Sequence, residues 1–206
     1  MNYGRSILVA VLAAAAGAAQ AGGVGIRAGT TGVGADLGWD IAPTLGGRVG
    51  ISAMSINTDV ETSSVNYDAN VKLANLNLFL DWSPLGPFRI TGGFIANDNK
   101  VDLTGRPTSG AAAGATLTGQ VKPERDFAPY LGVGYGNVWT KGINFYFDLG
   151  VMFQGTPQVT LNCQSANPAQ CAAAQPQIEA ERQRVQDELN RFKYYPVANI
   201  GLTIGW

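Results

Sequence analysis

Residues 196–206, PVANIGLTIGW, close the chain and decide its fold. Apolar residues alternate there with small or polar ones, which is the period of two of a β-strand with one apolar face. The apolar positions are Ala198, Ile200, Leu202, Ile204 and Trp206. In a water-soluble sheet this strand would be a poorly masked apolar edge, whereas in an outer-membrane barrel it meets lipid and pairs with the first strand. The stretch therefore predicts the closing strand of a transmembrane barrel.

The terminal aromatic residue also predicts partners. Trp206 after an alternating apolar run resembles the signal by which bacterial barrel proteins are recognised for assembly, although Phe is commoner than Trp at this position. The expected partners are the barrel-assembly machinery, acting on this strand, and the lipid of the outer membrane.

The same alternation recurs through the rest of the chain and predicts an all-β protein, an eight-stranded antiparallel transmembrane β-barrel. The expected strands begin near Gly22 and then cover about residues 33–41, 48–53, 67–82, 88–95, 127–135, 143–154 and 196–206. An even number of strands and an alternation of short turns with longer connections suit a bacterial outer-membrane barrel. A lipocalin-like soluble barrel is the competing fold, but it hides its apolar face inside. Here the bulkiest side chains share one face, which favours lipid outside.

Three segments depart from simple alternation. The first half of the fourth strand has the opposite parity, which predicts a β-bulge near Leu73 and Ala74. Residues 104–120 are rich in Gly, Ala, Ser and Thr without any period, and predict a mobile loop. Residues 157–192 predict a long outer loop with one short helix over 176–192, begun by Pro176. We expect this helix to cap the mouth of the barrel, with contact to a partner as the alternative.

The N-terminus has the pattern of an export signal. Arg5 is followed by a short apolar run and by Ala19-Gln20-Ala21, a small-x-small cleavage pattern. The run is well short of the roughly 20 apolar residues that a membrane-spanning helix needs. We therefore expect residues 1–21 to be a signal peptide cleaved near Ala21, residues 22–206 to form one domain, and the protein to reside in the bacterial outer membrane.

Composition excludes several functions. Histidine is absent and the net charge is −1, so histidine-dependent catalysis and a basic nucleic-acid surface are both excluded. Cys163 and Cys171 are expected to form a disulfide in an exported protein, and no histidine or further cysteine is present to complete a zinc site. We predict no catalytic residue, no metal and no cofactor.

The polar face of the strands supplies the candidate functional residues. The lumen or channel candidates are Arg27, Asp36, Asp40, Arg48, Asp81, Arg89, Asp148, Tyr130, Tyr146 and Asn199, together with Asn75, Asn77 and Gln154. Buried charges are tolerable only when paired, so a salt-bridged plug that fills the barrel is one interpretation. A thin polar path opened by the inward glycines is the other, and the sequence slightly favours the plug. Four tryptophans next to the short turns or at the chain end predict an aromatic girdle: Trp39, Trp82, Trp139 and Trp206.

Four short segments carry a family resemblance: Gly29-Thr30-Thr31-Gly32, Ala128-Pro129-Tyr130-Leu131-Gly132, Gly155-Thr156-Pro157-Gln158-Val159 and the Pro196 to Trp206 end. In them the chain resembles the small outer-membrane barrels of the carbapenem-associated type, also described as ornithine-uptake porins. The resemblance implies an eight-stranded barrel and passage of small, basic amino acids, without implying any substrate-binding residue.

The functional hypothesis is thus a narrow passive channel for small solutes. The alternative is a non-conducting structural or surface-contact barrel that acts through its outer loops. A lipid-modifying enzyme is disfavoured by the missing histidine.

Overall fold

The computed structural model describes residues 21–61, 65–107, 114–165 and 168–206, so the predicted signal peptide up to residue 20 lies outside it. The described part holds eleven strands and one helix. In chain order these are β1 (Gly22–Gly29), β2 (Gly32–Ala42), β3 (Leu45–Glu61), β4 (Val65–Leu85), β5 (Phe88–Asn97), β6 (Lys100–Pro107), β7 (Thr116–Lys122), β8 (Phe127–Tyr135), β9 (Gly142–Met152), β10 (Gln158–Gln164), α2 (Pro168–Leu189) and β11 (Tyr195–Gly205).

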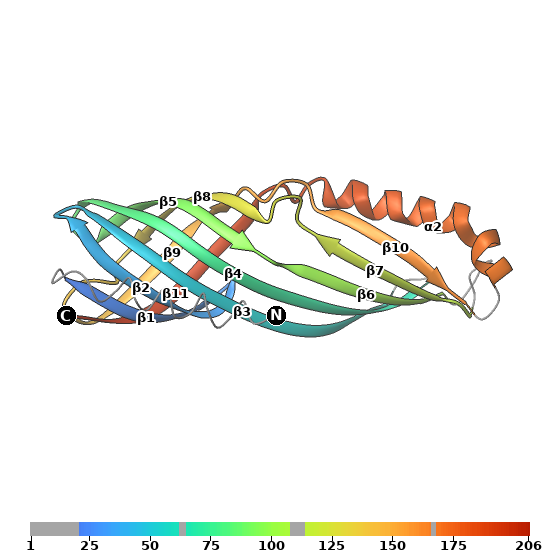
Figure 1. The fold of residues 1–206 in the computed structure, drawn as a ribbon, viewed down its shortest axis with the longest axis horizontal. Helices are drawn as coiled ribbons and strands as arrows, with labels where there is room; N and C mark the ends of the chain where they lie inside the picture. Colours follow the sequence, from blue (N-terminus) through green and yellow to red (C-terminus); the bar gives the residue numbers. More distant parts are fainter. Residues whose placement is uncertain (1–20, 62–64, 108–113, 166–167) are drawn as a thin grey trace, which may run out of the picture.

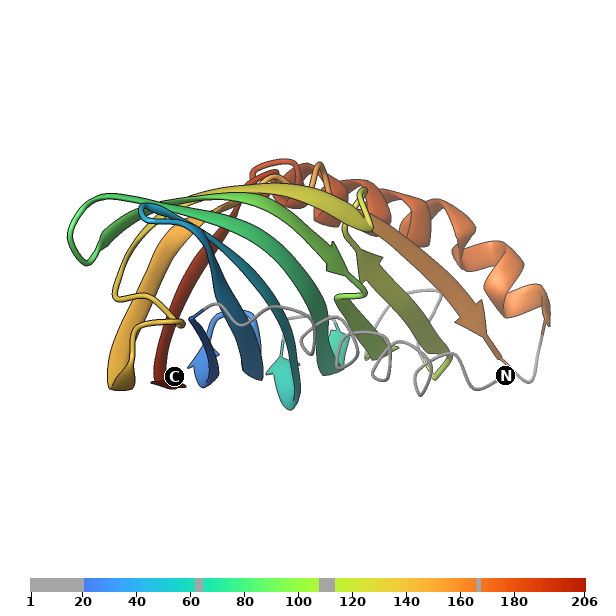
Figure 2. The same cartoon turned by 60° about the vertical axis from the view of Figure 1, so that its left-hand side comes forward.

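Eight of the strands close into an antiparallel ring, as the sequence predicts. The ring order is β1-β2-β3-β4-β5-β8-β9-β11, and β11 returns to β1 with the register Gly23↔Gly205 to Gly29↔Asn199. Figures 1 and 2 show the ring as the rounded half of the molecule. The C-terminal stretch is therefore the closing strand.

The ring has its apolar face outside. Along β11 the burial alternates strictly, with Asn199 and Thr203 buried and Ile200, Leu202 and Ile204 more than half exposed. Ile26 and Ile143 on neighbouring parts of the ring are exposed as well. This is the reverse of a lipocalin-like barrel, and it is the arrangement that lipid stabilises.

The other three strands extend the sheet beyond the ring (Figure 1). β3 and β4 are 17 and 21 residues long, and β4 exchanges its neighbour along its length. Asn75 pairs with Asn97 of β5, whereas Lys72 pairs with Lys100 of β6, and β6 is followed across the sheet by β7 and β10. We call β6, β7, β10, α2, residues 55–61 of β3 and residues 65–72 of β4 the extension, and we call its direction from the ring upward.

The extension overturns the predicted mobile loop at residues 104–120. Most of that segment lies in β6 and β7, while residues 108–113 lie outside the described part. The period of this hairpin is short and weak, because Leu117 and Val121 are the apolar residues of β7 on one face and Gly119 lies between them. Pairing with β4 supplies the order that the local sequence does not predict.

The predicted bulge at Leu73 and Ala74 is wrong, because β3 and β4 keep one register from Leu45↔Trp82 to Glu61↔Asn66. The change of parity has another cause. From Ala74 toward Trp82 the outward face is apolar, whereas above Ala74 the same face carries Lys72 and the opposite face carries Val71. At this level the environments of the two faces of the strand change places, while the backbone keeps its register.

Helix α2 differs from the predicted cap in its start and its place. It begins at Pro168 and contains Pro176, and the Cys163–Cys171 disulfide ties its first turns to β10. Ala174 and Ile178 are buried against Leu117 and Leu161 of the extension. The helix therefore covers the apolar face of the extension instead of capping the barrel mouth (Figure 1). No helix in the described residues is long and apolar enough to cross a membrane.

Candidate functional site

The centre of the lumen is a network of ion pairs around Arg48. Its guanidinium donates to Asp81 at 2.9 and 3.2 Å and to Asp148 at 2.7 and 3.0 Å. Arg89 donates to Asp148 at 2.6 Å, and its Nε lies 3.5 Å from Asp81. Thr91 donates a further hydrogen bond to Asp81 at 2.5 Å. All four charged side chains are 0–2% exposed, so the two arginines and two aspartates neutralise one another inside the barrel.

A second cluster lies beside the first. Arg27 donates to Asp36 at 2.6 Å, and both side chains are fully buried. The hydroxyl of Tyr146 donates to the other oxygen of Asp36. The Tyr146 ring also lies 5.7 Å from the Arg48 guanidinium and 5.5 Å from that of Arg89, which links the two clusters by cation–π contacts.

The inward glycines make room for these large side chains. A Cβ on Gly132 or Gly150 would lie 2.3 or 2.5 Å from the Tyr130 hydroxyl, and one on Gly201 would lie 2.3 Å from the Tyr146 ring. An eight-stranded barrel is only wide enough for side chains to fill it. The glycines thus allow neighbouring residues to occupy the lumen, which agrees with the plug interpretation.

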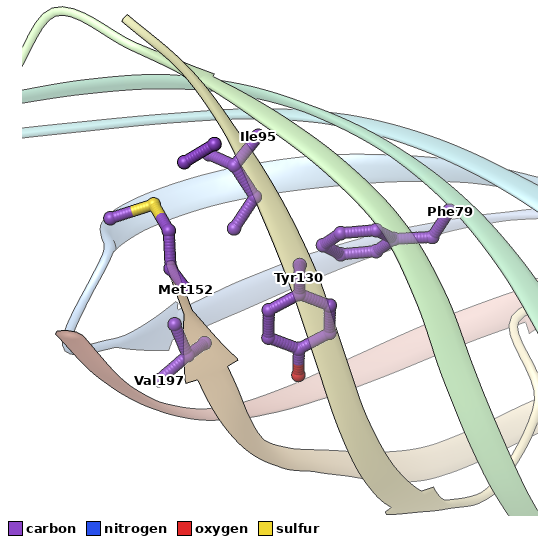
Figure 3. Packing of buried hydrophobic residues seen from close by; sticks show 6 residues of the cluster. Phe79, Ile95, Tyr130, Met152 and Val197 are labelled. Carbon is purple, nitrogen blue, oxygen red and sulfur yellow. The ribbon is translucent and has the colours of Figure 1, made fainter. Parts of the chain in front are cut away.

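An apolar layer lies next to the ion pairs, and the sequence analysis missed it (Figure 3). Phe79 and Tyr130 stack with their ring centroids 4.6 Å apart. Ile95, Met152 and Val197 join them, and each is at most 3% exposed. The signal that could have found the layer is the position of Phe79 and Ile95 at inward parity on neighbouring strands.

A chain of amides lies at the end of the lumen from which the extension rises. Asn199 accepts from the Thr31 hydroxyl at 2.9 Å, and the Asn75 amide donates to the Thr31 carbonyl at 3.1 Å. Asn99 then donates to Asn75 at 3.1 Å and accepts from the Ala74 amide at 3.0 Å. Thr31 and Asn99 were not predicted, because both lie in connections outside the predicted strands.

The opposite end of the lumen is closed by the turn between β8 and β9. Val138 is fully buried, and a Cβ on Gly38 would lie 2.7 Å from its side chain. Trp139 is half-buried over Gly46, an inward position of β3. Trp139 is thus not part of the predicted outward girdle, because its turn folds into the lumen. Asp40, a predicted lumen residue at this end, makes no ion pair among the described residues.

The other three tryptophans point outward. Trp39, Trp82 and Trp206 are 39%, 50% and 60% exposed. All three lie at the end of the barrel that carries the β2–β3 and β4–β5 turns, and interfacial aromatic residues are typical of both ends of membrane barrels.

Two of the solved structures that this chain resembles are CarO proteins of Acinetobacter baumannii. CarO from Acinetobacter baumannii matches with a TM-score of 0.62 and 24% sequence identity, over 89% of this chain and 97% of CarO. CarO2 from Acinetobacter baumannii matches with a TM-score of 0.62 and 21% identity, over 90% of this chain and 98% of CarO2. No family model matches the sequence, and neither does any curated protein. The fold is therefore a CarO-like eight-stranded barrel of the outer-membrane type.

Proposed function

We propose that this chain is an outer-membrane protein whose barrel is closed to solutes in the present conformation and which acts through its extension, as a structural or surface-contact barrel. Residues 1–21 are then removed on export, and residues 22–206 form the mature domain. Outer-membrane lipid and the barrel-assembly machinery are its expected partners. No enzyme activity is part of the proposal.

The observation that carries this proposal is the bidentate clamp of Arg48 on both Asp81 and Asp148, with every charged side chain at most 2% exposed. A solute crossing the lumen would have to separate these pairs, and breaking a buried ion pair costs about 3–5 kcal/mol. The rings of Phe79 and Tyr130 lie on the same route together with Ile95 and Met152, and this layer presents mainly apolar surface to a polar solute.

A narrow passive channel for small solutes such as basic amino acids is the second candidate. It is favoured by buried polar atoms along the lumen that have no hydrogen-bond partner among the described residues, namely Ser52 Oγ, Asn97 Oδ1 and the Tyr130 hydroxyl. Such atoms bind water or solute well when either is present. The lumen candidates from the sequence would then line the path.

Single-channel conductance of the refolded protein in a planar bilayer tests the proposal. The wild-type protein is expected to insert, as judged by heat-modifiable migration on a gel, and to stay silent. The Arg48→Ala variant removes the clamp and is expected to open intermittently, which shows that silence is not failed insertion. Discrete wild-type openings that change on addition of lysine or ornithine, but not glutamate, would establish the channel instead.

A further inference from the structure

The exchange of polarity along β3 and β4 marks where the lipid-facing surface ends. On the outward face, Ala53 of β3 lies opposite Ala74 of β4, and Ile51 lies opposite Leu76 below them. Above this level the outward face carries Ser55, Lys72 and the residues paired with them. The stretch from Ala74 down to Trp82 matches the roughly 9–11 residues that a tilted strand needs to cross the bilayer. The level of Ala74 is therefore the boundary between acyl chains and head groups.

Three lysines lie in one cross-strand row directly above this boundary. Lys72 of β4 pairs with Lys100 of β6. Val101 of β6 pairs with Val121 of β7 at the end of their ladder, so Lys100 and Lys122, the residues next to this pair, lie on the same face of the sheet. Paired residues of an antiparallel sheet share a face, so all three ammonium groups point away from the helix-covered side. Lys72 is two residues from Ala74, which places the row about 5–7 Å above the boundary along the strand.

On β4 and β6 the acidic residues of this face lie further from the boundary, whereas Asp98, whose backbone amide donates to the Ala74 carbonyl, lies at the boundary. Asp102, in the next row, accepts from Lys72 at 2.8 Å, and Asp68 lies opposite Thr104 in the row beyond. Among the described residues neither Lys100 nor Lys122 has an ion-pair partner within 4.0 Å. Like charges directly opposite one another destabilise a sheet. A phosphate placed against the row would remove that repulsion.

The surface below the row suits an acyl chain. Lys122 lines a cleft of about 580 Å³ together with Leu76 and Ala96, which are outward residues of β4 and β5. Asp98 and Asp126 also line this cleft. Just below it, the rings of Phe94 and Phe127 stack 4.9 Å apart, and both are about half exposed. The lysine row, which can contact a lipid head group, thus lies above the stacked rings, which can contact an acyl chain.

We propose that the Lys72–Lys100–Lys122 row binds the phosphate of an outer-leaflet lipid whose acyl chains lie over Phe94 and Phe127. The inference rests on the proposed outer-membrane location and names a partner for the part of the extension that lies next to the barrel. The partner is a phosphate-bearing membrane lipid, and free phosphate is not expected to replace it, because the phosphate alone makes none of the apolar contacts.

Native mass spectrometry of the refolded mature chain in detergent tests this proposal. The probes are diphosphoryl lipid A, a dephosphorylated lipid A and a zwitterionic phospholipid. The Lys100→Gln/Lys122→Gln variant is expected to bind diphosphoryl lipid A about 25-fold more weakly, since each basic residue near a lipid surface contributes about 1 kcal/mol, a factor of about 5. The Lys141→Gln/Lys193→Gln variant makes the same charge change elsewhere on the exposed surface, and it is expected to bind as the wild type does.

Each other outcome decides against the lipid site. Equal binding by the row variant and the control variant would overturn the site. Equal binding of phosphorylated and dephosphorylated lipid A would overturn the role of phosphate. Displacement of the lipid by millimolar inorganic phosphate would show an anion site without lipid contacts. Loss of heat-modifiable migration in the wild-type protein would instead refute the barrel in the membrane, so the two proposals fail separately.

Discussion

The barrel and the extension are built from the same two strands, yet they distribute charge in opposite ways. Within the barrel, β3 and β4 turn Arg48 and Asp81 inward, and both side chains are almost completely buried. In the extension, the same strands continue without a register shift and expose Lys72, whose pair with Asp102 is 47% and 35% exposed. The comparison shows that alternation along a strand determines only which residues share a face. The surrounding solvent decides which face carries charge, and how much each ion pair stabilises the fold.

The largest expected difference between the two regions is in the cost of losing one cation. Arg48→Met leaves Asp81 and Asp148 buried with only Arg89 near them, so the free energy of unfolding should fall by about 3–5 kcal/mol. Lys72→Met removes an exposed pair and should cost at most about 1 kcal/mol. Urea unfolding in detergent, followed by tryptophan fluorescence and heat-modifiable migration, measures both.

The double variant Arg48→Met/Asp148→Asn serves as the control for the buried network. It restores charge balance in the lumen, so it should recover part of the stability that Arg48→Met loses. Equal costs for Arg48→Met and Lys72→Met would mean that water reaches the network, and the contrast between the regions would fail.

The next effect should be confined to the extension. Cys163→Ser/Cys171→Ser removes the staple between β10 and α2, and the chain-entropy cost of so short a loop is about 2.5 kcal/mol at most. Hydrogen exchange should show faster opening of α2 and β10 with unchanged protection in β1 and β11. Faster exchange throughout the ring would show that the two regions unfold as one unit.

A smaller effect separates the inside of the barrel from its outside. Gly150→Ala places a methyl group 2.5 Å from the Tyr130 hydroxyl in the filled lumen, so it should destabilise by about 1–3 kcal/mol. Gly92→Ala has no heavy atom within 4 Å of the new methyl group and should change stability by at most about 0.5 kcal/mol. The same urea measurement compares them, and a harmless Gly150→Ala would indicate unfilled space beside Tyr130.

The smallest expected effect is a titration in the extension. Hydrogen bonds from Lys72 and then Gln120 hold the pKa of Asp102 below its ordinary value. The pair therefore stabilises the protein above the ordinary carboxyl pKa of about 3.9, and this contribution is lost as the pH falls through the lowered pKa. Lys72→Gln should raise the pKa of Asp102, as followed by NMR of the labelled protein in micelles. An unchanged pKa would show that Gln120 alone sets it.

The sequence predicts the ring well because its signal is local. Strict alternation in residues 196–206 and 143–152 is set by lipid on one side, and the structure confirms these strands as β11 and β9. The extension escaped prediction because β6 and β7 owe their order to β4, a strand distant in sequence. The helix start was wrong because Pro is a typical first residue of a helix at Pro176 and at Pro168 alike, and the helix begins at the earlier one, Pro168.

The sequence predicts which residues line the candidate site better than it predicts how these residues are arranged. Inward parity alone places Arg48, Asp81, Arg89 and Asp148 in the lumen, but it does not say which of them meet. The pairing depends on strand tilt, which brings Arg48 of β3 against Asp148 of β9 across the barrel. The aromatic layer followed the same rule and was overlooked, because Phe79 and Ile95 are apolar residues on a face expected to be polar.

The shared edge of β4 has a consequence for the order of folding. β5 and β6 occupy successive parts of one edge, and the hydrogen bond from the Ala74 amide to Asn99 lies where one strand gives way to the other. The β3, β4 and β6 contacts connect nearby parts of the chain, whereas closing β1 on β11 connects its two ends. Closing a longer loop costs more conformational entropy. We therefore expect the seam between β1 and β11 to close after the contacts of β3 with β4 and of β4 with β6 have formed.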